Sequence, residues 1–234
     1  VELGQESPWK LYWDGRPIAT QQTSMTHFEK EGVGYQGSGV SWPYVEGITS
    51  LREVSSTPTM RVWEVVATRC GSGEATRSFR LTFELRIPAG GDWFSMRLTR
   101  MESTDPVQIE VREYFNIPRT TFEARHVANG PGFSAWSDGT VGFGMVCLDG
   151  NCSGLSIQEG RTGITVANPP PERFRIQKGE SHDGWGPEVV YFVTDKTSPE
   201  QLAARPRTLQ RRWHASWPVL RRMPLRPHVT GSIQ

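Results

Sequence analysis

The sequence predicts an all-β fold, a large antiparallel two-sheet sandwich that ends in a short helical appendage. Three observations support this. Apolar and polar residues alternate with a period of two in consecutive segments, and the 24 glycines and 17 prolines lie mainly between these segments. A helical pattern is nearly absent before Thr197. A chain of 234 residues is also of a size that one β-sandwich can form as a single domain.

The most regular strand is predicted at residues 79–87, where five apolar residues alternate with charged or polar ones. A turn at AGGD leads to a second strand at 93–101, and a third follows the STDP turn at 107–111. Upstream, the β-branched run at 60–70 predicts a fourth strand. Because short, turn-rich links join these four segments, we expect them to form an antiparallel meander.

The remaining elements are shorter. Further strands are expected at 133–137, 141–147, 155–158, 163–166, 173–177 and 189–194.

A helix is expected near the end of the chain, since Ser198 precedes Pro199 and Glu200, an arrangement typical of a helix start. We expect Pro206 to end or kink this helix, and a second short helix to follow at 207–215. The domains are therefore predicted as a β-sandwich, residues 1–198, and a basic helical appendage, residues 199–234, packed on it.

The appendage contains seven arginines and one acidic residue. It could dock on the acidic sandwich, bind a polyanion or remain solvated, and its tryptophans and leucines favour docking. Over the whole chain, 26 basic residues nearly balance 25 acidic ones, so the composition indicates no general attraction to nucleic acid. No run of 18 apolar residues occurs, so no membrane span is expected. The composition does not specify an oligomeric state.

Two of the three cysteines, Cys147 and Cys152, flank the tetrapeptide LDGN, which predicts a tight turn between strands. We expect a disulfide between them, and two reduced cysteines in an ordinary hairpin are the alternative. So small a loop would contribute only about 2 kcal/mol in the chain-entropy treatment. A disulfide would indicate an oxidising compartment, and hence a secreted or periplasmic protein.

The region from Arg61 to Ile117 resembles the galactose mutarotase-like super-sandwich. The resemblance lies in a long strand followed by RIPAGGDWFSMRLTRMESTDPVQIEVREYFNIP, and AWSDGTVGFGM is similar to an aromatic and acidic segment that often follows in such folds. The resemblance implies a curved sheet with a polar concave face and a function in carbohydrate chemistry. Families with this fold include sugar epimerases, domains of polysaccharide lyases and glycosidases, and non-catalytic modules. The epimerase pattern of two histidines and a catalytic glutamate has no residue-by-residue match here.

Alternation places many charged side chains on the polar faces of the long strands. A guanidinium group is a planar fork of donors suited to carboxylates or paired sugar hydroxyls, and aromatic rings offer flat plates to sugar C–H groups. We therefore expect an oligosaccharide or polysaccharide, including an acidic one, on the concave sheet face. The candidate binding residues are Arg80, Arg97, Arg112, Arg119, Trp136, Asp138 and Trp185. The alternative is a solvated face of cross-strand Arg–Glu pairs, each contributing about 0.2–1 kcal/mol.

Catalysis by a polysaccharide lyase would need a general base, a proton donor and a cation beside the uronate carboxylate. His126 or His182 could be the base and Tyr114 the proton donor, with Arg112 or Arg119 as the cation.

A glycoside hydrolase would instead need two carboxylates across the scissile bond. Glu84 with Glu110, or Asp138 with Asp183, are the conceivable pairs. No phosphate-binding, dinucleotide-binding or metal-ligand motif occurs, so neither a cofactor nor a metal is expected. Enzyme activity stays open, and the alternative is a non-catalytic carbohydrate-binding or structural and assembly module.

Overall fold

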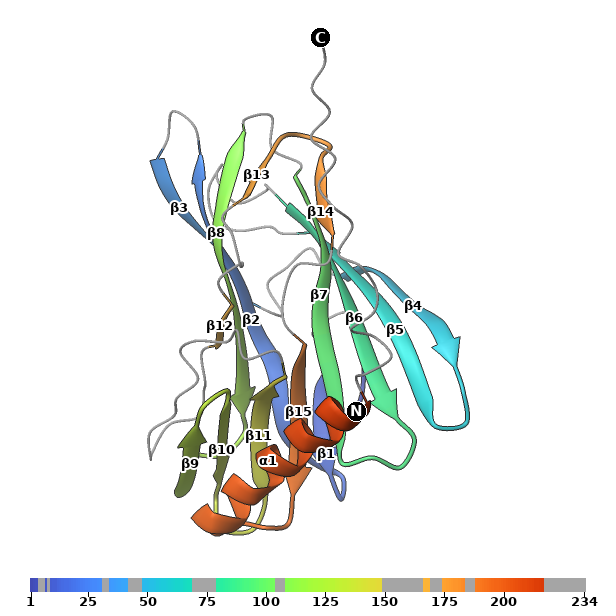
Figure 1. Ribbon diagram of the computed structural model, residues 1–234, viewed down its shortest axis with the longest axis vertical. Helices are drawn as coiled ribbons and strands as arrows, with labels where there is room; N and C mark the ends of the chain where they lie inside the picture. The colour runs from blue at the N-terminus through green and yellow to red at the C-terminus, as the bar shows by residue number, and fades with distance from the viewer. Residues whose placement is uncertain are drawn as a thin grey trace.

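The computed structural model describes residues 1–3, 7, 9–30, 34–41, 48–68, 79–103, 108–148, 166–168, 174–183 and 188–216. These residues form fifteen strands in two sheets and one C-terminal helix (Figure 1). Neighbouring strands pair antiparallel in both sheets. The predicted all-β, two-sheet sandwich with a helical C-terminal segment is therefore confirmed.

The smaller sheet has six strands and is centred on the long pairing between its second and third strands. In sheet order its strands are β1 (Lys10–Trp13), β2 (Arg16–Lys30), β8 (Ile109–Thr120) and β12 (Val166–Asn168), with β3 (Gly34–Ser41) beside β2 and β13 (Phe174–Ile176) beside β8. The β1–β2 turn is formed by Asp14 and Gly15, both with positive φ (48° and 75°). Asp-Gly favours this conformation, which matches the twist of a two-residue hairpin.

The larger sheet has nine strands. In sheet order they are β4 (Ile48–Ser56), β5 (Met60–Thr68), β6 (Phe79–Pro88), β7 (Trp93–Ser103), β15 (Val189–Thr194), β11 (Gly142–Cys147), β10 (Phe133–Ser137) and β9 (His126–Gly130), with β14 (Ser181–Asp183) beside β7.

The predicted meander is confirmed for β5, β6 and β7 and is wrong for the segment expected at 107–111. That segment belongs to β8, which pairs with β2 in the smaller sheet. Alternation identifies the residues that share one face of a strand, but it does not identify the partner strand.

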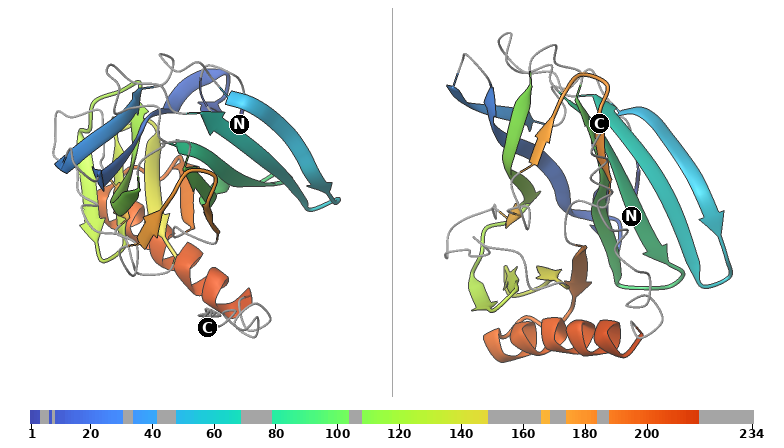
Figure 2. Two further views of the ribbon diagram at one scale, coloured as in Figure 1. Left: turned by 90° about the horizontal axis from the view of Figure 1, so that it is seen from above. Right: turned by 45° about the horizontal axis from the view of Figure 1, so that its top comes forward.

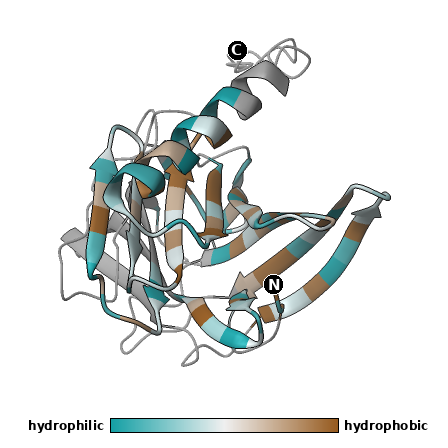
Figure 3. Ribbon diagram, turned by 90° about the horizontal axis from the view of Figure 1, so that it is seen from below, coloured by the Kyte–Doolittle hydropathy of each residue, from teal (hydrophilic) through white to brown (hydrophobic). Residues whose placement is uncertain are grey.

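The main core lies between the two sheets, where the inward-facing side chains of both pack together. At its centre, the Trp9 ring lies 5.0 Å from the ring of Phe94 and 4.7 Å from that of Tyr191. Along the larger sheet, hydrophobic and hydrophilic residues alternate in bands (Figure 3). A bulge at Thr99 shifts this alternation, so Met101 and not Arg100 faces the core.

The larger sheet also has an outer face, turned away from the smaller sheet. On its β9–β10–β11–β15 half, the helix α1 (Pro199–Ser216) packs against a second apolar cluster (Figure 1). Leu202 and Leu209 of the helix are buried there. The close approach requires Gly142, because a Cβ at that position would lie 2.8 Å from Leu202 Cδ2. The helix thus packs on the outer face of the larger sheet.

Pro206 lies inside this single helix, so of the two expectations, an end or a kink, the end is wrong, and so is the expected second helix. Proline removes one backbone hydrogen bond and strains the preceding turn. Here Leu202 and Leu209, on either side of Pro206, are both buried against the sheet. Packing of an apolar helix face outweighs intrinsic propensity, so both halves of the helix stay on the sheet.

The other half of the outer face, formed by β4, β5, β6 and β7, is not covered by the helix. Seen from above (Figure 2, left) and from below (Figure 3), β4 and β5 curve toward the side of the sheet on which α1 lies. The uncovered half is therefore the concave side of these strands, where the sequence predicts polar residues.

Candidate functional site

The uncovered half of the outer face contains five arginines and five carboxylates on neighbouring strands, which we name the charged face. Strand register and ion pairs place them on this side of the sheet, opposite the core residues. The members are Arg52, Glu64, Arg80, Glu84, Arg86, Arg97, Arg100, Glu102, Asp183 and Glu188. The formal charges of these ten described residues cancel.

Most ion pairs on this face are exposed and join adjacent strands. Arg52 on β4 lies 2.8 Å from Glu64 on β5. Arg80 on β6 lies 3.7 Å from Glu102 on β7. Exposed pairs of this kind contribute at most about 1 kcal/mol each. These two pairs fit the interpretation of a solvated sheet surface with ion pairs between neighbouring strands.

A different arrangement occurs at the middle of the face, where Glu84, Arg86, Ser95 and Glu188 meet; we name these four residues the Arg86 centre. Arg86 Nε donates to Glu84 Oε1 at 2.7 Å, and Nη1 lies 3.5 Å from Glu188 Oε2. Ser95 Oγ donates to Glu188 Oε1 at 2.5 Å. Glu188 is only 2% exposed. A buried carboxylate is costly unless it is paired and hydrogen-bonded, and these contacts supply that compensation.

An aromatic side chain borders the Arg86 centre. Trp93 lies on β7 two residues before Ser95 and therefore on the same face of the strand. Its indole is half-buried against the apolar cluster beneath α1. In the preceding turn, Asp92 forms an ion pair with Arg205 of α1, so the helix is fixed beside this border.

Two of the predicted binding residues, Arg80 and Arg97, lie together on the charged face. Arg112 and Arg119 do not, because both belong to β8 in the smaller sheet. Arg112 and Arg119 therefore do not share a sheet face with Arg80 and Arg97. The cause is the same crossing of β8 to the other sheet, which alternation could not reveal.

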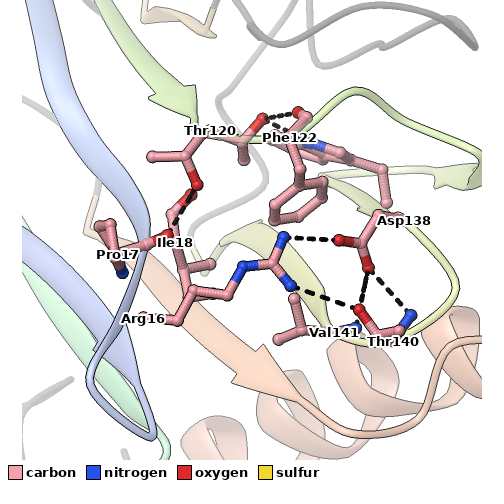
Figure 4. Close-up of polar contacts among 10 residues, drawn as sticks. Arg16, Pro17, Ile18, Thr120, Phe122, Asp138, Thr140 and Val141 are labelled. Carbon is pink, nitrogen blue, oxygen red and sulfur yellow. Dashed lines mark hydrogen bonds and ion pairs between the residues drawn. The ribbon is translucent and has the colours of Figure 1, made fainter.

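The side chain of Asp138 is fixed by hydrogen bonds to other residues of the protein (Figure 4). It follows β10, and its carboxylate accepts hydrogen bonds from the Thr140 hydroxyl at 2.6 Å, the Thr140 and Val141 amides and the Arg16 guanidinium at 2.8 Å. Burial is the largest single influence and raises the pKa of Asp138. The four hydrogen bonds outweigh burial and hold the pKa well below its usual range. These contacts explain Asp138 as a residue that joins the β10–β11 turn to the β1–β2 hairpin.

Trp136 is a core residue, so its prediction as a sugar platform is wrong. Its side chain is 0% exposed, and its ring meets Phe143 edge-on at 5.0 Å. The indole N–H is also satisfied internally, since it donates to Thr120 Oγ1 at 3.2 Å. An indole without an open face cannot stack on a ligand. Both sides of β10 are buried. In such a strand, the position of a residue does not tell whether its side chain is exposed.

The three residues proposed for β-elimination lie in separate places. His126 begins β9 at one edge of the larger sheet, and His182 lies on β14, beside β7. Four strand spacings separate β9 from β7, or roughly 19 Å. Tyr114 belongs to β8 of the smaller sheet. The carboxylate pair Glu84 and Glu110 is likewise divided between the two sheets.

Several predicted residues fall outside what the structure describes. Trp185 and Cys152 are outside the described residues, and so are the side chains of Tyr114 and Arg112. Cys147 is buried at the end of β11. The disulfide between Cys147 and Cys152 therefore stays a prediction.

Within the described ranges, no helix is long and apolar enough to cross a membrane. In the same part of the chain, no three histidine, cysteine or acidic side chains converge as ligands of a metal ion would.

Sequence reasoning missed Glu188 and Trp93 as possible site residues. Glu188 precedes a strand, VVYFVT, that has no alternation, so nothing in its surroundings marked an outward face. Trp93 begins a strand whose alternation was recognised, and its odd position, shared with Ser95 and Arg97, could have placed it on the polar face. The burial of Glu188 depends on Ser95 and Arg86, which are about a hundred residues away in the chain.

The fold and the charged face together define an antiparallel two-sheet β-sandwich with a polar concave sheet face. The chain is similar to a GH36 alpha-galactosidase from Geobacillus stearothermophilus, with 12% identity over 73% of this chain and 30% of that chain and a TM-score of 0.41. It is also similar to an alpha-mannosidase from Enterococcus faecalis V583, with 12% identity, 87% and 28% coverage and a TM-score of 0.49. A third similar structure is a Klebsiella pneumoniae protein described as an aldose 1-epimerase, with 9% identity, 82% and 67% coverage and a TM-score of 0.36.

The chain thus spans less than a third of the length of the galactosidase and of the mannosidase. No protein-family model matches the chain, and no curated protein matches it in sequence. Because all three TM-scores lie below 0.5, the proposals below rest on the charged face itself.

Proposed function

We propose that this chain is a carbohydrate-binding domain that holds an oligosaccharide or polysaccharide on the charged face. The supporting observation is the Arg86 centre, where guanidinium, carboxylate and hydroxyl groups from β6 and β7 meet around the Glu188 carboxylate, which lies just before β15 and is only 2% exposed. Sugar hydroxyls both donate and accept hydrogen bonds, so donors and acceptors placed side by side suit them. The half-buried ring of Trp93 adds an apolar plate at the border.

The competing interpretation is that these ion pairs only stabilise the sheet surface. It accounts for Arg52 with Glu64 and for Arg80 with Glu102, which are exposed. It explains Glu188 less fully, because a buried carboxylate that is paired and hydrogen-bonded gives no more stability than apolar side chains of similar size would. A buried polar cluster kept without a gain in stability is a candidate binding site.

We favour binding over cleavage. A β-elimination site requires base, proton donor and cation around one sugar, whereas His126 and Tyr114 lie in different sheets. Hydrolysis requires two carboxylates with room for the scissile bond between them, and Arg86 occupies the space between Glu84 and Glu188.

The test is a glycan array probed with the purified chain, followed by titration calorimetry on the strongest ligand. Replacing Arg80, Arg97 and Arg100 together by Met should weaken binding at least tenfold, because hydrogen bonds to charged groups are lost. The matched control is Arg175→Met, which removes an exposed ion pair with Glu110 from the smaller sheet. Absence of binding to every glycan, or unchanged affinity of the triple variant, contradicts the proposal.

The same samples test cleavage. A lyase would generate an unsaturated sugar that absorbs in the ultraviolet, and a hydrolase would generate new reducing ends. We expect neither signal. Either signal, lost on replacement of His126 or His182 by Ala, would replace the binding proposal by an enzymatic one.

We further propose that the protein functions in an oxidising compartment, secreted or periplasmic, with Cys147 and Cys152 joined. The two cysteines lie five positions apart, and Cys147 is fixed at the end of β11. Measuring whether Cys147 and Cys152 are oxidised in the native protein tests the disulfide.

A further inference from the structure

We propose that the Arg86 centre is the sugar-binding subsite of the charged face and that it selects uncharged sugars through two neighbouring hydroxyl groups. This inference rests on the proposed function and deepens it, since it names the subsite and the class of sugar.

Arg86 is less exposed than Arg52, Arg80 and Arg100 of the charged face. Its side chain is 28% exposed, whereas those of Arg52, Arg80 and Arg100 are 66%, 52% and 49% exposed. Carboxylates contact its guanidinium on two sides, at Nε and at Nη1. A side chain ordered before binding loses little conformational entropy when a ligand arrives, so its hydrogen bonds contribute more to affinity.

The centre leaves one donor group and one acceptor atom open. Within the described part of the chain, neither Nη2 of Arg86 nor Oε2 of Glu84 has a hydrogen-bond partner. The two groups belong to side chains already joined at 2.7 Å, so they are close neighbours. One sugar hydroxyl can accept from Nη2 while its neighbour donates to Oε2, which is the pattern that a vicinal diol offers.

The charges favour an uncharged ligand. The centre itself contains one positive charge, on Arg86, and two negative ones, on Glu84 and Glu188, and Arg97, the cross-strand neighbour of Glu84, adds a second positive charge beside it. A uronate carboxylate placed at Nη2 would lie beside the Glu84 carboxylate, and their repulsion would offset the attraction to Arg86. A neutral hydroxyl pair meets no such penalty.

Trp93 is placed to support the ring of the same sugar. Two residues along a strand span about 7 Å, which is the scale of one pyranose ring with its substituents. A ring bound at Arg86 beside Ser95 would therefore extend toward the Trp93 indole. Glu188 and Ser95 act as positioning residues, because buried Glu188 contacts Arg86 and buried Ser95 donates a hydrogen bond to Glu188.

The experiment compares neutral and uronate-containing oligosaccharides of equal length on one array, followed by calorimetry with the best neutral ligand. The variants are Glu84→Gln and the double variant Arg86→Met with Glu188→Gln, which removes both charges so that no buried charge is left unpaired. The matched control removes one of the exposed ion pairs of the face, Arg52→Met with Glu64→Gln. Circular dichroism and thermal melting verify that each variant is folded.

We expect neutral oligosaccharides to bind in preference to uronates, and both centre variants to lose at least tenfold in affinity while the control keeps it. Glu84→Gln retains the shape and one acceptor oxygen, so its loss of affinity reports on the charge and not on packing. Preference for uronates, or full affinity in both folded centre variants, overturns the inference while the charged face remains a glycan site. Absence of any glycan binding overturns the proposed function itself.

Discussion

Replacement of Asp138 by Asn should weaken the junction between the β10–β11 turn and the β1–β2 hairpin. The Asp138 carboxylate accepts hydrogen bonds from Arg16 and from the two residues that follow the turn, Thr140 and Val141 (Figure 4). The asparagine side chain keeps one acceptor oxygen for the amides of the turn but loses the charge. The variant therefore isolates the contribution of the charge from that of the turn geometry.

The expected loss of unfolding free energy follows from these contacts. The ion pair with Arg16, whose side chain is 47% exposed, contributes at most about 1 kcal/mol. Hydrogen bonds to a charged acceptor exceed neutral ones by about 0.5–1 kcal/mol each, and two amide donors are involved. The sum is about 2 kcal/mol for Asp138→Asn. Asp138→Ala removes the acceptors as well and should cost about 3–4 kcal/mol.

The effect should depend on pH in one direction. The folded-state pKa of Asp138 is lowered, so the unfolded chain binds the proton more readily than the folded protein. The stabilisation is therefore complete above the ordinary Asp pKa of about 3.9 and is lost progressively as the pH falls below it. The difference between wild type and Asp138→Asn should be constant near neutral pH and should shrink in acid.

Urea unfolding monitored by circular dichroism at several pH values measures this difference. Arg16→Met serves as the control, since it removes the ion pair and the long Arg16 hydrogen bond to Thr140 Oγ1 at 3.4 Å but leaves the Asp138 carboxylate in place. Its effect should be smaller and should decrease in high salt. Equal stability of wild type and Asp138→Asn at pH 7 would refute the structural role of the carboxylate. A difference that grows on acidification would refute the sign of the pKa shift.

Three further predictions concern packing and covalent structure. Leu202→Ala should destabilise the protein by about 2–5 kcal/mol in urea unfolding, because a fully buried side chain is removed, whereas the exposed Thr208→Ala should have little effect. Trp136→Phe should cost about 1–3 kcal/mol through its lost indole hydrogen bond and leave glycan affinity unchanged; weaker glycan binding in the folded variant would return Trp136 to the site. Peptide mass mapping without reductant should recover Cys147 linked to Cys152, and labelling of both thiols in the native protein would show the disulfide prediction to be wrong.

The strands with regular alternation were predictable because one face is buried and the other is not. In β6, Leu81, Phe83 and Leu85 are buried while Arg80 is exposed. Period-two patterning reports this difference directly. The start of α1 was predictable for a similar local reason, since the Ser198 hydroxyl accepts a hydrogen bond from the Gln201 amide at 3.3 Å, as an N-cap does.

The long strand β2 could not be recognised from its sequence, RPIATQQTSMTHFEK, which has few apolar residues and no regular alternation. Its pairing with β8 is a long-range contact that residue patterns do not encode. One signal was present and unused: the Asp14–Gly15 dipeptide between two short runs is a strong hairpin indicator and would have placed β1 beside β2.

The Arg86 centre depends on the same long-range information. Alternation placed Glu84 and Arg86 on the outward side of β6. What distinguishes them from other outward residues is Glu188, which lies immediately before β15, the strand on the far side of β7. The Glu84–Arg86 ion pair becomes part of a buried cluster only because Glu188 approaches it from a distant part of the chain. The alternation within β6 alone does not predict that approach.

The position where alternation stops along the larger sheet explains why the helix and the candidate site lie side by side. β6 and β7 alternate, so their outer faces tolerate water, whereas β15 and β11 are buried on both faces. A strand that is apolar on both sides needs a cover on each, and α1 provides it on the outer side. Glu188 stands at the first residue before β15, where the chain passes from the uncovered to the covered half. Glu188 is therefore buried because it lies where the half of the sheet covered by α1 begins. As a result, the charged face has one carboxylate that solvent does not screen.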